Sequence, residues 1–122
     1  MEGLRNRTKE FSLRMIRLYT ALPKKTEVQV IGKQMLRSGT SVAANFREAS
    51  RARSTAEFVA KLGIVEQELD ETMLWLELIV ETEMMRRELV ESLHGEAEEL
   101  LKIVITSIRK SRSIRRKSDN SS

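Results

Sequence analysis

Apolar residues recur every three or four positions in four separate stretches of this chain, and this periodicity constrains the fold more than any other feature. Such spacing places residues on one face of an α-helix, so each stretch predicts an amphipathic helix. The first stripe comprises Phe11, Met15, Leu18, Tyr19 and Leu22. The second comprises Val28, Ile31, Met35, Ser38, Val42 and Phe46. The third comprises Phe58, Leu62, Val65, Leu69, Met73, Leu76 and Val80, and the fourth Leu89, Leu93, Leu100, Val104 and Ser107.

Proline and capping residues mark the boundaries of the first two helices. The first helix should end at Leu22-Pro23, because the residue before a proline avoids the helical region. Thr26 followed by Gln29 predicts a capping box at the start of the second helix. Glycine and other small residues then narrow the middle of that helix: Ser38, Gly39, Thr40, Ser41, Ala43 and Ala44. Because a glycine inside a helix costs roughly 0.5–1 kcal/mol, we expect a neighbouring helix to approach closely there.

A second capping signal, Ser54 with Glu57, predicts the start of the third helix. That helix should run to about Glu81, and the fourth should cover roughly 87–110. Short connections make neighbouring helices antiparallel, so the sequence predicts an up-down-up-down four-helix bundle. The third and fourth helices carry more apolar surface than one small bundle can bury, which indicates an oligomer interface.

The length of 122 residues, with 40% hydrophobic residues and no cysteine, suits one domain without disulfides. We expect the bundle to occupy 1–110. Residues 111–122 are basic and serine-rich, and they predict a disordered basic tail. The longest apolar run, 73–80, is too short to span a bilayer and contains Glu77. We therefore expect a cytoplasmic protein with no membrane partner.

The net charge of +4 conceals a strong asymmetry along the chain. Residues 1–53 hold 12 Lys and Arg against 4 acids, whereas residues 54–85 hold one Lys against 8 acids. Residues 106–122 hold 6 basic residues against one acid. A basic first half and a basic end leave surface for an anionic partner.

Arginines cluster where the second helix should end, and they are the leading candidates for a binding site. Arg47 and Arg51 are four residues apart and share a helix face, and Arg53 follows them. Guanidinium groups bind phosphate oxygens in pairs, so we predict a nucleic-acid-binding site here. Arg37 and Lys33 support this cluster from the same helix. The alternative is that Arg47, Arg51 and Arg53 pair with Glu48 and with acids of the third helix such as Glu57.

The sequence contains few residue patterns that are typical of enzyme active sites. His94 is the only histidine, and its Glu91…His94 spacing has no second copy that could complete a carboxylate-bridged metal site. No phosphate-binding glycine loop or nucleophile with its base occurs. We therefore predict no catalytic residues, no metal and no cofactor.

Most of the chain also resembles a known family. The elements that carry the resemblance are Gly32-Lys33-Gln34-Met35-Leu36-Arg37-Ser38, then Ser41-Val42-Ala43-Ala44-Asn45-Phe46-Arg47-Glu48-Ala49, then Arg51 and the helix start 54–58. They resemble the four-helix-bundle proteins encoded in intervening sequences of bacterial 23S ribosomal RNA genes. Phe46 and Ala49 depart from the usual small aliphatic residue and glycine of that pattern.

This resemblance implies a protomer that assembles into a ring, a homopentamer. The related accessory variability proteins of diversity-generating retroelements share the architecture, and they are thought to bind nucleic acid and a reverse transcriptase. We therefore expect a non-enzymatic homo-oligomer that binds RNA, or DNA, through its basic surface. The alternative is an interaction scaffold that docks a protein partner and has no direct role with nucleic acid.

Overall fold

The protein consists of four α-helices joined by short connections. The computed structural model describes the backbone of residues 2–121 and the side chains of residues 3–117, and this part of the chain contains no strand. The helices are α1 Glu2–Ala21, α2 Thr26–Ser50, α3 Thr55–Glu81 and α4 Arg87–Ser121. The predicted all-helical class with four helices is confirmed.

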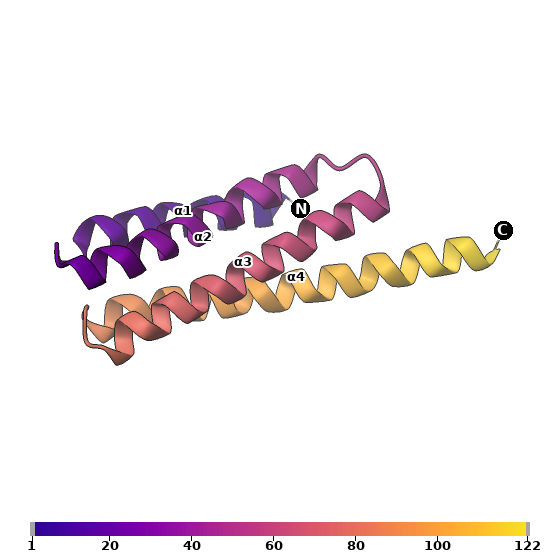
Figure 1. The fold of residues 1–122 in the computed structure, drawn as a ribbon. Helices are drawn as coiled ribbons and strands as arrows, with labels where there is room; N and C mark the ends of the chain where they lie inside the picture. Colours follow the sequence, from indigo (N-terminus) through magenta and orange to yellow (C-terminus); the bar gives the residue numbers. More distant parts are fainter. Residues whose placement is uncertain (1, 122) are drawn as a thin grey trace.

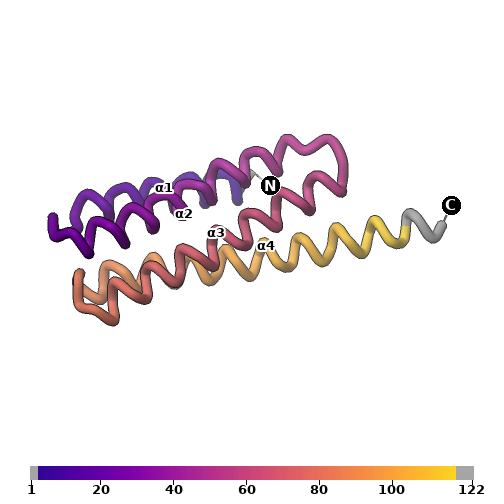
Figure 2. Tube along the Cα trace, viewed as in Figure 1, coloured from indigo at the N-terminus to yellow at the C-terminus, as the bar shows by residue number. Residues whose placement is uncertain are grey.

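The helices lie side by side along one common direction (Figure 1). Each consecutive pair, α1 with α2, α2 with α3 and α3 with α4, is in close contact, whereas contacts between α1 and α4 are sparser. Consecutive helices run in opposite directions in this view, so the α1–α2 and α3–α4 connections share one end. The α2–α3 connection lies at the other end, toward which the last turns of α4 extend (Figures 1 and 2). No helix within the described residues is long and apolar enough to cross a membrane.

The start of α3 follows the sequence prediction. Ser54 is the N-cap residue, and its side-chain oxygen accepts a hydrogen bond from the backbone N–H of Glu57 at 3.1 Å. The N-cap side chain satisfies an N–H group that has no partner within the helix, and this hydrogen bond stabilises a helix by about 1 kcal/mol.

The predicted capping box at the start of α2 is wrong. Lys25 occupies the N-cap position without a side-chain hydrogen bond, and Thr26 is already the first helical residue. The side chain of Gln29 instead donates to the carbonyl of Pro23 at 2.9 Å and accepts from the hydroxyl of Tyr19 at 3.0 Å. Gln29 therefore ties α2 back to the end of α1 rather than capping its own helix.

The turn after α3 contains a residue with left-handed backbone conformation, Glu83, whose φ is 58°. The N–H of Glu83 donates to the carbonyl of Val80, and the N–H of Met84 donates to the carbonyl of Ile79, both at 3.1 Å. This is the Schellman arrangement, in which the left-handed position usually carries glycine.

α2 approaches α1 closely, as its small residues predicted. A Cβ atom added to Gly39 would lie 2.4 Å from Cγ of Met15, and one added to Gly32 would lie 2.7 Å from Leu22 Cδ1. The backbone carbonyl of Gly39 also accepts a buried hydrogen bond of 2.9 Å from the hydroxyl of Ser12. The buried small residues of α2, Gly32, Ser38 and Gly39, therefore serve packing within the chain.

The core contains a few polar groups, and each has a partner. The hydroxyls of Ser38 in α2 and Thr72 in α3 lie 2.8 Å apart and are buried. Among the described residues, no buried side-chain nitrogen or oxygen lacks a hydrogen-bond partner. The rest of the core is apolar and includes Phe46 and Ala49, the two residues that depart from the family pattern.

The end of α4 differs from the sequence expectation. Residues 111–121 continue α4 as a helix, where the sequence predicted a disordered tail beginning at residue 111, and Ser122 lies outside the described residues. Neither proline nor glycine occurs after Gly95, so nothing in the sequence interrupts the helical backbone. The side chains of residues 112–117 are all exposed.

Candidate nucleic-acid interface

Four of the five predicted site residues lie on one face of α2, which we call the basic stripe: Lys33, Arg37, Arg47 and Arg51. Their spacing of 4, 10 and 4 residues returns to the same side of a helix with 3.6 residues per turn. All four are exposed, and the opposite side of α2 carries the buried residues. Arg53, the fifth, is exposed in the α2–α3 connection.

Arg37 is engaged within the protein. Its guanidinium forms ion pairs with Glu68 of α3, at 3.4 Å, and with Glu71. The indole N–H of Trp75 donates to the same Glu71 carboxylate at 3.1 Å. Arg37 is therefore held by two acids of α3.

The other three arginines, Arg47, Arg51 and Arg53, form what we call the arginine cluster, and they differ from Arg37. No ion pair joins any of them to an acid among the described side chains. Glu48 pairs instead with Lys61 of α3, at 3.4 Å. Glu57 accepts a hydrogen bond from the backbone N–H of Arg53, not from its guanidinium, at 3.2 Å. Glu48 therefore pairs with another helix, whereas the Glu57 carboxylate lies at the backbone of Arg53 without pairing with its guanidinium.

A shallow hollow of about 390 Å³ separates these side chains on α2, lined by Ala43, Ala44, Arg47, Glu48 and Arg51. The side chains of the two alanines are short, so the space between Arg47 and Arg51, which are about one helical turn apart, stays open. A phosphate oxygen in this hollow could accept hydrogen bonds from both guanidinium groups.

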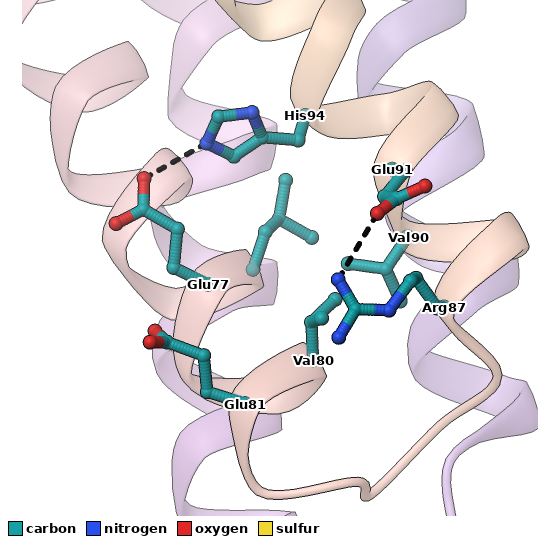
Figure 3. A pocket seen from close by; sticks show the side chains of 8 residues that line it. Glu77, Val80, Glu81, Arg87, Val90, Glu91 and His94 are labelled. Atoms are coloured by element: carbon teal, nitrogen blue, oxygen red, sulfur yellow. Dashed lines mark hydrogen bonds and ion pairs between the residues drawn. The ribbon is translucent and has the colours of Figure 1, made fainter.

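A second hollow lies where α3 turns into α4, and it contains the single histidine (Figure 3). Nε2 of His94 lies 2.8 Å from a carboxylate oxygen of Glu77, and Arg87 pairs with Glu91 at 3.2 Å. No group of three or more His, Cys, Asp or Glu residues is placed to hold a metal ion in the described part of the chain. Arg87 and Glu91 thus pair along α4, and His94 and Glu77 are joined across α4 and α3.

The sequence reasoning missed two features of the interface. One is the pair between Lys61 and Glu48, which depends on how α2 and α3 are aligned and has no signal in the sequence. The other is the helical end of α4, where Lys110 and Lys117 lie seven residues apart on one side. The spacing of Ser107, Ser111 and Ile114 could have signalled that helix.

The molecule is thus a four-helix protein with an arginine-rich outer face on its second helix. Comparison with known families gives its place: the family described as "23S rRNA-intervening sequence protein" matches residues 4–106, and the chain belongs to this family. The resemblance seen in the sequence is therefore confirmed.

A solved structure shows the same fold. It is the crystal structure of a protein of unknown function from the S23 ribosomal protein family of Bacteroides thetaiotaomicron VPI-5482, with a TM-score of 0.81 and 42% sequence identity. The match covers 86% of this chain and 97% of that one. No curated protein matches.

Proposed function

We propose that this protein is a non-enzymatic, cytoplasmic bacterial protein that binds nucleic acid, RNA above all, through its basic surface. The observation that carries the proposal is the arginine cluster, whose three side chains are exposed and pair with no acid among the described residues. Guanidinium groups that pair with no acid are free to donate hydrogen bonds to an anionic ligand, and no neighbouring carboxylate offsets their attraction for it. Lys33 extends the surface along α2, whereas Arg37 contributes less because Glu68 and Glu71 hold it.

The placement of the aromatic residues supports contact with the backbone rather than with bases. Proteins that bind single strands present exposed aromatic rings on which bases stack. Here none of the five aromatic side chains is exposed: Phe11, Tyr19, Phe46, Phe58 and Trp75. The ligand that fits this surface is therefore a duplex, bound through its phosphates with little sequence preference.

We further propose that the chain is the protomer of a ring, a homopentamer of antiparallel up-down-up-down bundles. Support comes from apolar side chains left on the outer face of α3, where Ile64 is 37% exposed and Leu74 is 48% exposed. Burial of this face between protomers would remove apolar surface from water, and a ring would repeat the arginine cluster around its axis. Light scattering should give the mass of five chains of 14.1 kDa, and Ile64→Asp with Leu74→Asp should lower it. A wild-type mass of one chain at micromolar concentration would refute the ring.

Binding is tested by fluorescence anisotropy with a labelled RNA hairpin across a series of salt concentrations. The triple variant Arg47→Ala, Arg51→Ala, Arg53→Ala should bind more weakly. The slope of log affinity against log salt should flatten by about 0.9 for each phosphate that the variant no longer neutralises, the value for duplex DNA.

A matched control removes three charges from the opposite end of the molecule: Lys24→Ala, Lys25→Ala and Arg86→Ala. These residues are exposed near the α1–α2 and α3–α4 connections, so the control should keep most of the affinity and the slope. Equal behaviour of the two triple variants would show that the arginine cluster is not the site.

A second candidate function, an interaction scaffold for a protein partner, is favoured by one observation. Val30 is 59% exposed on the same outer face of α2 as Lys33, and its burial against a protein partner would remove apolar surface from water. This function predicts a partner whose capture from a lysate survives nuclease and is abolished by Val30→Asp, together with weak binding to purified RNA.

A further inference from the structure

The first turns of α1 lie beside the last turns of α2, which carry Arg47 and its neighbours (Figures 1 and 2). Halfway along α2, the hydroxyl of Ser12 donates to the carbonyl of Gly39, and Met15 is in close contact with Gly39. The two helices run in opposite directions, so a residue farther along α2 lies level with one earlier in α1. Arg47 comes eight residues after Gly39 and therefore lies level with residues 4–7 of α1.

Two basic residues of α1, Arg5 and Lys9, which we call the α1 pair, lie on the side of α1 that borders α2. Arg5 comes seven residues before Ser12, so it points within roughly 20° of the direction in which Ser12 meets α2. Lys9 and Met15 lie roughly 60° to either side of Ser12. Because Met15 is fully buried, Lys9 lies on the outer side of the seam between the two helices, where it is exposed, and Arg5 is half-buried.

The arginines of α2 lie on the same outer side of this seam. Arg47 is turned roughly 80° from Gly39, in the direction opposite to the buried Met35, and Arg51 is turned roughly 40° farther. Packed helices lie about 8–10 Å apart, so the α1 pair and these two arginines can reach phosphates of one stretch of nucleic-acid backbone.

Acids offset little of the charge on this outer side. Three acids of α1 and α2 have described side chains, and Glu10 pairs with Arg17 at 3.5 Å, roughly 140° around α1 from Arg5. Glu27 lies near the other end of α2 and roughly 160° around it from Arg47. Glu48 borders the face, and Lys61 offsets its charge at 3.4 Å. No ion pair joins the α1 pair to an acid among the described side chains.

We propose that the α1 pair binds the same duplex backbone as Arg47 and Arg51, so that the ligand crosses the seam between α1 and α2. The inference rests on the proposed function and deepens it, because it extends the site to a second helix and defines how the ligand lies on the protein. A backbone that followed α2 alone would contact the arginines without contacting the α1 pair.

Two variants of equal charge on one helix test the seam in the full-length protein. Arg5→Gln with Lys9→Gln removes the α1 pair. Arg14→Gln with Arg17→Gln removes two charges from the side of α1 that borders α4, where Arg14 donates to the hydroxyl of Ser92 at 2.8 Å. With a duplex RNA probe, loss of the α1 pair should flatten the salt slope by about 1.8, which corresponds to two phosphates at the value for duplex DNA. The control should leave the slope close to that of the wild type, because distant charges act only through attraction that salt screens.

Chemical footprinting of the wild-type protein gives a readout that does not depend on how a variant folds. The protein is treated with a guanidinium reagent and an amine reagent, with and without duplex RNA, and the modified residues are located by mass spectrometry. Duplex RNA should protect the α1 pair together with Arg47 and Arg51. Arg14 and Arg17 should stay as reactive as in the free protein.

The outcomes separate the inference from the function on which it rests. Suppose that the triple variant of the arginine cluster binds weakly, while the α1 pair behaves like its control and gains no protection. The ligand then lies on α2 alone, and the proposed function stands without the seam. If none of these variants changes binding and no residue is protected, both are wrong. Equal protection of Arg14, Arg17 and the α1 pair would also overturn the inference, since the contact would then not be confined to the seam.

Discussion

Gly39 provides a sharp test of how α1 and α2 pack, because a single methyl group has a calculable effect. An alanine Cβ would lie 2.4 Å from Cγ and 3.1 Å from Cβ of Met15. Cβ is fixed by the backbone and Cγ is one bond from it, so movement of the side-chain end cannot relieve the contact. The core must instead shift, and overpacking of this kind costs about 1–3 kcal/mol.

The opposing term is helix propensity. Replacing glycine by alanine inside a helix stabilises a protein by about 1 kcal/mol. Because the contact is far shorter than van der Waals distance, we place the steric cost at the upper end of its range. Gly39→Ala should then lower the free energy of unfolding by about 2 kcal/mol.

Gly95 supplies the matched control. It also lies within a helix, but a Cβ added there would meet no atom within 4 Å. Gly95→Ala should therefore raise the free energy of unfolding by up to about 1 kcal/mol. Urea denaturation followed by circular dichroism measures both variants, at one protein concentration because assembly would add to apparent stability.

The same substitution in a second variant, which lacks most of the Met15 side chain, tests whether the contact with Met15 causes the loss of stability. In a Met15→Ala protein most of the cost of Gly39→Ala should disappear, because Cγ and Sδ of Met15 are gone and only Cβ of residue 15, at 3.1 Å, remains. The reasoning is refuted if Gly39→Ala is as stabilising as Gly95→Ala, or if it costs the same with and without the Met15 side chain.

Three further predictions concern single residues. Ser54→Ala should cost about 1 kcal/mol in urea denaturation, since the Glu57 N–H loses its cap, and a Ser54→Asp variant should retain most of the stability. Glu83→Gly should stabilise by up to about 1 kcal/mol, because relief of the left-handed conformation outweighs the added chain entropy; a decrease in stability would contradict the assigned turn. Arg37→Gln should weaken binding to duplex RNA less than Arg47→Gln, and an equal effect would show that the pairs with Glu68 and Glu71 do not occupy Arg37.

The sequence predicted those parts of the fold that depend on local patterns. Periodicity located four helices, and Ser54 with Glu57 located the start of α3, because capping involves residues three apart. Thr26 with Gln29 has the same pattern, yet Gln29 bonds to Pro23 and Tyr19 instead. Those partners come from the fold of the α1–α2 connection, which a local pattern cannot include.

The same limit applies to the candidate site. Arg37 and Arg47 are the same residue type on the same face of α2, and the sequence treats them alike. Only the alignment of α3 beside α2 places Glu68 next to one of them and Lys61 next to Glu48. Which arginines pair with an acid is therefore a property of the packed helices.

The pair between Lys61 and Glu48 determines how mutation can change the positive potential of the α2 face that carries the arginine cluster. Glu48 is three residues from Arg51 and adjacent to Arg47, so it is within reach of the arginine cluster if Lys61 no longer holds it. A substitution such as Lys61→Ala would release this carboxylate toward the arginines and lower the positive potential of the face. Lys61 lies on α3, and its side chain need not touch the ligand. Mutation at this position can therefore change the affinity for an anionic ligand while the binding residues stay the same.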